Sequence, residues 1–328
     1  MYPEKRSIQI GVAGILCGAI LLLFGSGAMD PAIQVFTDPD VMSVVWFLET
    51  GRVMPPVAHN ATQQETRPPQ EMQEQDGVAV FAPEDARLVE VNSVCGYNVN
   101  VEALLQSSLK WQLRQDAPTV LILHTHGTES YTKTEDYQES SPYRTQDAGH
   151  NMISVGEELK LLLENAGIGV IHDKMLHDSP SYSNSYNYAR SSIKKYLEQY
   201  PSIRLVLDLH RDSVEDGSGD QRRFVTKVGD KDVAQLMLVV GTDANGLTHP
   251  RWPENMALAV KLQAQLEKEN PGICRPISFR KQRFNQDLSV GALIVEIGAA
   301  GNTRQEALLA TRELANAIIT LSAGTQMQ

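Results

Sequence analysis

The segment Thr119-Val-Leu-Ile-Leu-His124-Thr-His126-Gly-Thr-Glu129-Ser-Tyr131 decides the fold class. Its opening run is almost entirely apolar, which is typical of a parallel strand that is buried on both faces. Two later segments also begin apolar and end polar: Leu205-Val-Leu-Asp-Leu-His210-Arg-Asp-Ser and Leu293-Ile-Val-Glu296-Ile-Gly-Ala-Ala-Gly-Asn302. The sequence therefore predicts three buried strands with reactive side chains at their carboxyl ends.

Helical patterns alternate with these strands. Residues 151–166 place apolar side chains on one helix face, and Gly167 follows where a helix C-cap is expected. Further helices are expected at 186–200, 255–268 and 304–321, and a hairpin at 224–240 is expected at the edge of the sheet. This alternation predicts an α/β fold with a predominantly parallel, twisted sheet and helices on both faces. Ligands of such folds bind beyond the carboxyl ends of the strands.

The N-terminal region predicts a membrane anchor. No charged residue lies between Arg6 and Asp30, and about 20 apolar residues are enough to cross a hydrocarbon core of roughly 30 Å. A cleavable signal peptide that ends near Gly25 is the alternative. Basic residues precede the apolar run, so residues 1–7 are expected in the cytoplasm, 8–29 across the cell membrane, and the rest outside it.

The remaining chain divides by composition. A juxtamembrane segment is expected at 30–54 and a polar tether at 55–90, because Pro, Gln and Glu dominate the tether and it has few large apolar side chains. A lead-in strand and helix at 91–116 precede the catalytic domain at 117–328.

Charge and cysteine content exclude other classes. The 328-residue chain has a formal net charge of −11, which argues against a nucleic-acid partner because phosphate neutralisation needs concentrated basic residues. Three cysteines are too few for a disulfide framework and match no zinc-finger spacing. A Cys95–Cys274 bond and two isolated thiols remain as alternatives.

The strand ends favour a metal site over a metal-free polar cleft. Neutral imidazole and carboxylate groups are the donors that suit Zn²⁺, and a further carboxylate can take a proton from water. Ser130 and Ser213 lie near histidines but outside a nucleophile elbow, so a serine hydrolase has little support. The other histidines, His172, His177 and His249, are expected at the surface or in loops.

Four separated motifs carry a resemblance over residues 117–322. They are the segment from His124 to Tyr131, Gly167-Ile-Gly-Val-Ile-His-Asp, Asp208-Leu-His-Arg-Asp-Ser, and Asn285-Gln-Asp-Leu-Ser with the later Val-Glu-Ile-Gly-Ala-Ala-Gly-Asn-Thr. Together they resemble the stage II sporulation protein P family. The resemblance implies an N-acetylmuramoyl-L-alanine amidase, with endopeptidase activity as well, that cleaves stem peptides from peptidoglycan during engulfment of the forespore. It also implies stage II sporulation proteins D and M as partners at the septal or engulfing membrane.

The family is similar in fold to zinc amidases of the Amidase_3 type, and that similarity implies the metal ligands. A strand-end His-Gly matches His126, and a second strand-end His matches His210. The remaining ligand of those enzymes is a Glu four residues before an Asn. Asp147 stands at that position here, with Glu129 and His150 as alternatives.

The same similarity implies the catalytic base, and the roles of the neighbouring residues follow from the expected chemistry. Glu296 is expected to act as the catalytic base, within the pattern Glu-x-Gly-x-x-x-Asn that ends at Asn302. Arg211 is expected as a second donor to the oxyanion, or alternatively as a structural ion-pair partner of Asp212. His124, Asp212 and Asn302 are expected to support the ligands or to contact substrate. A catalytically inactive, membrane-anchored peptidoglycan-binding scaffold is the alternative function. Retention of all the candidate ligands favours the enzyme.

Overall fold

The computed structural model describes residues 81–109, 113–138, 142–179 and 181–324. The expected anchor at 8–29, the juxtamembrane segment and nearly all of the tether lie outside the described residues. Within the described part, no helix combines the length and apolar character that crossing a membrane requires.

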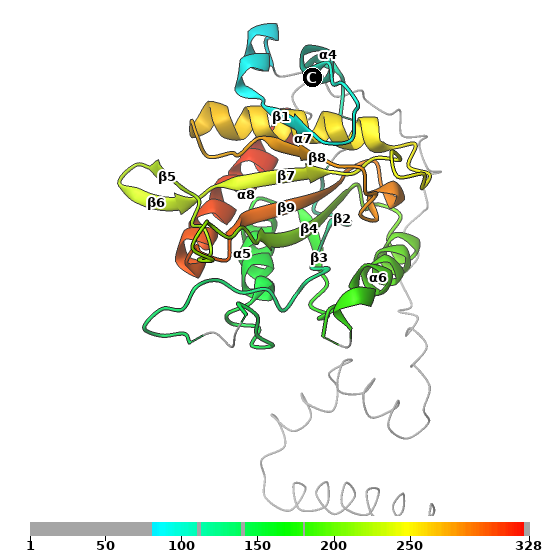
Figure 1. The fold of residues 1–328 in the computed structure, drawn as a ribbon. Helices are drawn as coiled ribbons and strands as arrows, with labels where there is room; N and C mark the ends of the chain where they lie inside the picture. The colour runs from blue at the N-terminus through cyan, green and yellow to red at the C-terminus, as the bar shows by residue number, and fades with distance from the viewer. Residues whose placement is uncertain (1–80, 110–112, 139–141, 180, 325–328) are drawn as a thin grey trace, which may run out of the picture. The chain divides into compact units, whose positions relative to one another are not determined.

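A seven-stranded sheet forms the centre of the fold, in the order β1-β8-β7-β9-β4-β2-β3 (Figure 1). Its strands are β1 (Val91–Ser93), β2 (Pro118–Leu123), β3 (Gly169–His172), β4 (Leu205–Asp212), β7 (Leu236–Val240), β8 (Ile277–Phe279) and β9 (Ala292–Ala299). Every neighbouring pair is parallel except β7 with β9. The prediction of a predominantly parallel sheet is confirmed.

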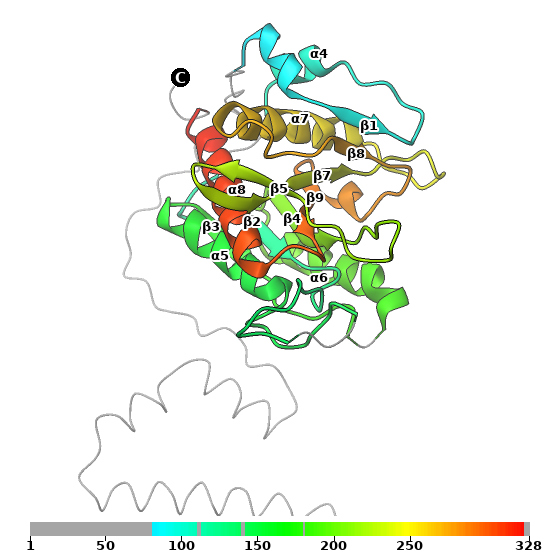
Figure 2. The same ribbon diagram turned by 60° about the vertical axis from the view of Figure 1, so that its left-hand side comes forward.

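Helices cover both faces of this sheet, as predicted, but unequally (Figures 1 and 2). The helices are α4 (Val101–Gln106), α5 (Met152–Asn165), α6 (Ser185–Gln199), α7 (Trp252–Glu269) and α8 (Arg304–Gly324), with short 3-10 helices η1 (Pro83–Leu88), η2 (Tyr182–Asn184) and η3 (Gln286–Leu288). Helices α5, α7 and α8 pack into the larger hydrophobic core, and α6 packs into a smaller one.

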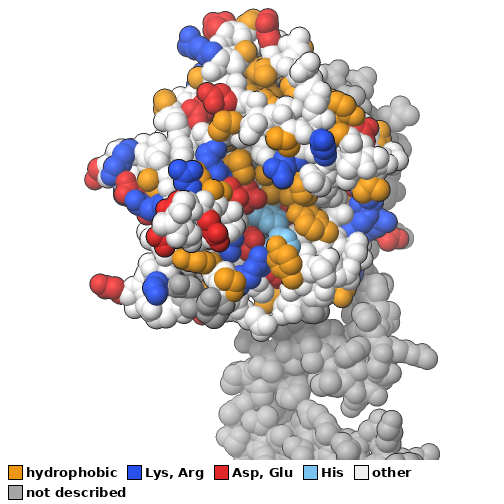
Figure 3. Space-filling model, viewed as in Figure 1, with side chains coloured by type: hydrophobic (Ala, Val, Ile, Leu, Met, Phe, Trp, Pro, Cys, Tyr) orange, Lys and Arg blue, Asp and Glu red, His pale blue; other side chains and the backbone are white. Residues whose placement is uncertain are grey.

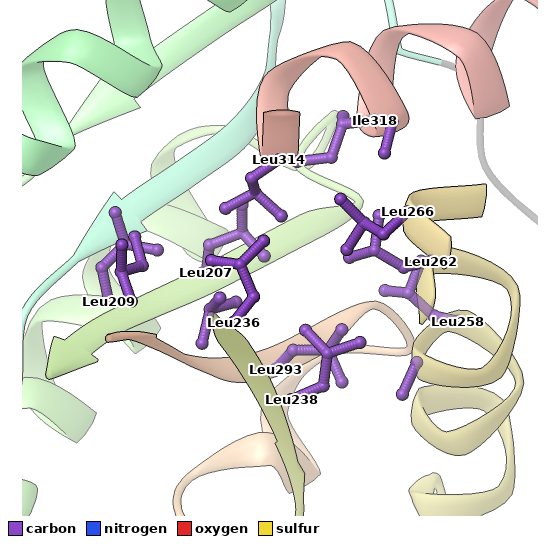
Figure 4. Close-up of a cluster of buried hydrophobic side chains, with 14 of the residues drawn as sticks. Leu207, Leu209, Leu236, Leu238, Leu258, Leu262, Leu266, Leu293, Leu314 and Ile318 are labelled. Carbon is purple, nitrogen blue, oxygen red and sulfur yellow. The ribbon is translucent and has the colours of Figure 1, made fainter. Parts of the chain in front are cut away.

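Alternation along the strands divides the side chains between these two cores. In β2, Val120 and Ile122 belong to the larger core, and Leu121 and Leu123 to the smaller one. Successive side chains of a strand point to opposite faces, so an apolar run without interruption fills both cores. Figure 4 shows the larger core, where leucines of β4, β7 and β9 meet side chains of α7 and α8.

The segment at 224–240 differs from the prediction. It forms a separate two-stranded antiparallel sheet of β5 (Val225–Val228) and β6 (Lys231–Ala234), while β7 enters the main sheet beside β9. Charged residues leave β5 and β6 only partly buried, whereas Leu236-Met-Leu-Val-Val has no charge and can be buried on both faces.

The two cysteines of the described region are both free thiols. Cys95 is buried, and its Sγ lies 3.5 Å from the hydroxyl of Ser93. Of the two alternatives for Cys95 and Cys274, the structure has the isolated thiols.

Candidate active site

Three adjacent strands bring the polar segments together. In the order β9-β4-β2 the carboxyl ends of these parallel strands meet at one rim, and His210 is paired in register with Glu296. Figure 3 shows histidine side chains at the centre of this face, among acidic and hydrophobic side chains. The sheet topology therefore places the end of each polar segment at a common site.

The centre of the site is a group of three buried side chains, His126, Glu129 and His210. The two imidazole rings are nearly perpendicular, at 85°, with their centroids 5.3 Å apart. The Nδ1 atom of His210 lies 3.5 Å from the Oε2 atom of Glu129. The Nδ1 atom of His126 is buried and has no hydrogen-bond partner among the described residues. Burying a nitrogen atom without a hydrogen-bond partner costs free energy unless a ligand binds to it.

The charges at this centre favour a cation. Burial opposes ionisation of Glu129, but Arg211 and His210 lower the pKa of this carboxyl to about 2. Burial also opposes protonation of His210, yet the carboxylates of Asp208 and Glu129 raise the pKa of this imidazole well above its ordinary value. Burial lowers the pKa of His126, which keeps that ring neutral. A positively charged His210 therefore lies between two buried carboxylates.

This donor set fits Zn²⁺ in its chemistry: two imidazoles and one carboxylate are ligands that zinc commonly takes in catalytic sites. Within the described residues, no three His, Cys, Asp or Glu side chains are arranged as a complete metal site. His210 has its Nε2 atom 3.0 Å from the Oδ1 atom of Asp208. The Oδ1 atom of Asp208 also accepts a hydrogen bond from the backbone N–H of Thr125, and its Oδ2 atom accepts one from the hydroxyl of Thr125. The donor types are present, but His210 also contacts the carboxylate of Asp208.

Asp147 and His150 lie apart from this group. Asp147 is exposed, and its carboxylate lies 2.8 Å from the Nδ1 atom of His150 and accepts a hydrogen bond from the N–H of Gly149. The ring of His150 stacks on Tyr137, with centroids 4.4 Å apart. Asp147, Glu129 and His150 are the three candidates for the remaining metal ligand. Of these, Glu129 is the one that contacts His210. Asn151 begins α5, as the predicted spacing requires, but Asp147, four residues earlier, lies at the surface.

The path of the chain between β2 and α5 explains why Asp147 lies at the surface. Isolated β-bridges join Glu129 to Arg144 and Ser130 to Asn151, so the two segments run side by side. Asp147 lies in the turn between the two bridged positions, and that turn is on the surface. Arg144 also pairs with Glu129, at 3.3 Å, and with Asp178, at 2.8 Å.

Arg211 does not present its guanidinium as a free donor. Its Nε atom donates to the carbonyl oxygen of Ser130, and its Nη2 atom donates to that of Tyr143. Its Nη1 atom lies 3.7 Å from Glu129, and the whole residue is 4% exposed. The alternative pairing with Asp212 is also absent from the contacts of Arg211: Asp212 pairs with Arg275 at 2.8 Å. Arg211 therefore holds the backbone around Glu129 and balances its charge.

Glu296 lies beside the group with one carboxylate oxygen free. Its Oε2 atom is buried without a hydrogen-bond partner among the described residues. Burial raises the pKa of Glu296 to about 8, and the neighbouring carboxylates of Glu129 and Asp212 act in the same direction, while His210 opposes them. Such a carboxyl group can hold and release a proton near neutral pH, as acid–base catalysis needs.

Asn302 is fully buried and shapes the end of β9. Its Oδ1 atom accepts hydrogen bonds from the N–H groups of Ala299 and Phe224, and its Nδ2 atom donates to Glu306. A side chain at Gly298, where φ is +69°, would come within 2.9 Å of Asn302. The Glu-x-Gly-x-x-x-Asn spacing therefore has a structural basis here: it fixes the turn that follows Glu296.

His124 lies one layer behind the site. Its Nδ1 atom is 3.1 Å from the carbonyl oxygen of Leu209, and its Nε2 atom is 2.8 Å from the Nε2 atom of His172. The Nδ1 atom of His172 lies 3.1 Å from Glu157. A Cβ at Gly156 would come within 2.6 Å of both imidazoles, so this position of α5 requires glycine.

The expectation of a surface or loop position for His172 is wrong: this residue ends β3, and its side chain is 1% exposed. His177 lies in a turn and His249 in a loop, but both side chains are buried and neither is at the surface.

Two tyrosines at the site gave no signal in the sequence. Tyr182 stacks on His126 with centroids 4.5 Å apart and planes at 14°, and the guanidinium of Arg144 lies 4.7 Å from the centroid of the same ring. Tyr186 meets His126 edge to face at 5.7 Å. They come from a Ser- and Asn-rich segment that begins several residues after the end of β3, so no strand-end pattern marks them.

Comparison with known proteins identifies the family. The family model described as Stage II sporulation protein P (SpoIIP) matches residues 50–319, which is more than half of the chain. Stage II sporulation protein P of Bacillus subtilis (strain 168) is 28% identical over 206 residues, which cover 60% of this chain and 49% of that protein. The chain thus spans about half the length of that relative.

Two solved structures match the chain at low similarity. The N-acetylmuramoyl-L-alanine amidase AmiC2 of Nostoc punctiforme is 14% identical, with a TM-score of 0.37 over 64% of this chain and 98% of that one. The CwlD amidase of Clostridioides difficile, solved with the GerS lipoprotein, is 12% identical, with a TM-score of 0.40 over 63% and 96%. We draw the family assignment from the family model alone: this chain belongs to the stage II sporulation protein P family.

Proposed function

We propose that this protein is a zinc-dependent N-acetylmuramoyl-L-alanine amidase that releases stem peptides from peptidoglycan during sporulation. One observation carries the proposal: His126, Glu129 and His210 form a buried group beside Glu296, at the rim where the strands end. Family membership supports the substrate and the cellular process.

We assign the zinc ligands to His126, Glu129 and His210. The contact of Glu129 with His210 supports its choice over Asp147 and His150, which pair with each other at the surface. When bound, a zinc ion would lower the pKa of a water molecule and polarise the amide carbonyl. His210 must give up its proton to act as a ligand, so zinc affinity should fall as the pH is lowered. The low pKa of Glu129 keeps this carboxylate ionised at neutral and mildly acidic pH.

Glu296 supplies the proton transfers. Its free Oε2 atom accepts a proton from the attacking water while the water oxygen bonds to the lactyl carbonyl carbon. The same carboxyl then delivers a proton to the alanine nitrogen as the C–N bond breaks, which leaves a free amine and a carboxylate. The first transfer requires the ionised carboxylate of Glu296, whereas the raised pKa of this group favours the second transfer, because the group holds its proton until the nitrogen departs.

Membrane attachment and partners extend this proposal. Residues 8–29 would anchor the chain in the cell membrane, with residues 1–7 in the cytoplasm and the catalytic domain outside, where peptidoglycan lies. Extraction of membranes with alkaline carbonate tests the anchor: an integral protein stays in the pellet. Stage II sporulation proteins D and M are the proposed partners, and co-purification from sporulating cells tests each of them.

Product analysis tests the activity. Purified protein with zinc is incubated with intact and with denuded peptidoglycan, and the products are identified by mass spectrometry. We expect free stem peptides that begin with L-alanine and glycan without peptides, and cut cross-links if the protein is also an endopeptidase. Glu296→Gln should abolish release, while Glu198→Gln, an exposed substitution in α6, should leave it unchanged. Binding to the wall without release would support the inactive scaffold and overturn the amidase.

A further inference from the structure

Hydrolysis of an amide places negative charge on the carbonyl oxygen, and a positioned hydrogen-bond donor stabilises that charge. Arg211 was expected in this role, but its guanidinium donates to the carbonyl oxygens of Ser130 and Tyr143 and lies against Glu129. A protein donor that assists the proposed zinc ion would therefore have to be another residue that reaches the site, and Tyr186 is such a residue.

Two aromatic side chains contact the ring of Tyr186. The ring meets that of His126 edge to face with centroids 5.7 Å apart, and it is tilted by 44° to that of Phe284 with centroids 5.9 Å apart. The carbonyl oxygen of Tyr186 accepts a hydrogen bond of 2.8 Å from the side chain of Asn285. Phe284 and Asn285 both have positive φ values, +53° and +62°. A positive φ is costly for a residue as bulky as Phe, and such strain persists where the surrounding structure requires it.

The hydroxyl of Tyr186 is uncommitted. It makes no hydrogen bond to another residue of the described chain, although Asp208, Glu296 and Glu129 are the charged groups that act on it. A tyrosine phenol has an ordinary pKa of about 10, so it is protonated near neutral pH and keeps its donor hydrogen. Tyr182 differs, because its ring lies flat between His126 and Arg144 and the residue is 58% exposed.

We propose that Tyr186 is a catalytic residue whose hydroxyl donates a hydrogen bond to the carbonyl oxygen of the scissile amide as that oxygen becomes negative. This inference rests on the proposed amidase function. The phenol donates without losing its proton, so the reaction is balanced by the proton transfers of Glu296 alone. The edge-to-face contact with His126 brings the ring next to a proposed zinc ligand, where the polarised carbonyl would lie.

The test is Tyr186→Phe, which removes the hydroxyl and keeps the ring contacts with His126 and Phe284. We expect kcat on peptidoglycan fragments to fall about 100-fold, as for loss of one oxyanion donor. KM and zinc content should stay at the wild-type values, since neither depends on the hydroxyl. Tyr188→Phe is the matched control: Tyr188 is in the same helix, is 38% exposed and should leave kcat unchanged.

A second measurement separates a catalytic from a structural role. A phosphinate analogue of the tetrahedral intermediate should bind Tyr186→Phe more weakly by the same factor as the loss in kcat, while the product peptide should bind equally well. Wild-type kcat in Tyr186→Phe, or equal losses for phosphinate and product, would overturn the inference and leave the amidase standing. A wild-type protein that releases no stem peptide would instead overturn the proposed function, and the inference with it.

Discussion

Gly156→Ala tests the packing behind the site. Gly156 belongs to α5 and faces the buried pair His124 and His172. An added Cβ would lie 2.5 Å from the Nε2 atom of His172 and 2.6 Å from that of His124. Neither ring can move aside freely, because His124 contacts the carbonyl oxygen of Leu209 and His172 contacts Glu157.

The expected cost follows from three contributions. Forcing a methyl group into a packed core costs about 1–3 kcal/mol. Separating the two imidazoles loses a buried hydrogen bond, which contributes about 1 kcal/mol. Alanine regains about 0.5–1 kcal/mol because it favours the helix more than glycine does. The free energy of unfolding should therefore fall by about 2 kcal/mol, although alanine is normally the better residue inside a helix.

Urea unfolding of the purified protein measures this change through the midpoint and the slope. Gly217→Ala is the control, because a Cβ there meets no atom within 4 Å, and its effect should stay within about 0.5 kcal/mol. Gly156→Ala should also cost less in a His172→Ala background, where one of the two clashing rings is gone. An unchanged or increased stability of Gly156→Ala would refute the packing of His124 against His172.

Two further predictions concern charge and metal. Burial lowers the pKa of Lys261 to about 8, and the folded protein therefore binds fewer protons than the unfolded chain between pH 8 and the ordinary lysine pKa of 10.5. The stability of the wild type relative to Lys261→Met should rise with pH over that interval, by about 3 kcal/mol in total; parallel stability curves would contradict a buried, destabilised ammonium. Removal of zinc by a chelator should stop the release of stem peptides and added Zn²⁺ should restore it, whereas full activity in the presence of the chelator would exclude a required metal.

The sequence predicts the sheet better than the site. Apolar runs locate β2, β4 and β9, because a strand buried on both faces needs an uninterrupted run. The antiparallel entry of β7 depends on pairing between distant segments, which local patterns do not encode. Tyr186 was missed for a related reason: it reaches the site through the packing of α6, away from any strand end.

The role of Arg211 could not be predicted from the strand pattern. Arg211 follows His210 within β4, where strand alternation would separate the two side chains, but the register of β4 with β9 shifts between His210 and Asp212. The guanidinium of Arg211 donates to the carbonyl oxygens of Ser130 and Tyr143 and lies 3.7 Å from Glu129. The position of Asp147 could not be predicted either, since a surface segment between two β-bridges determines it.

The zinc content of two matched variants tests the assignment of the site most directly. Glu129→Gln and Asp147→Asn each remove one carboxylate charge, one from the buried contact with His210 and one from the exposed pair with His150. After dialysis against limiting Zn²⁺, elemental analysis should find about one zinc per chain in the wild type and in Asp147→Asn, and far less in Glu129→Gln. Zinc retained by Glu129→Gln and lost by Asp147→Asn would contradict the site of His126, Glu129 and His210.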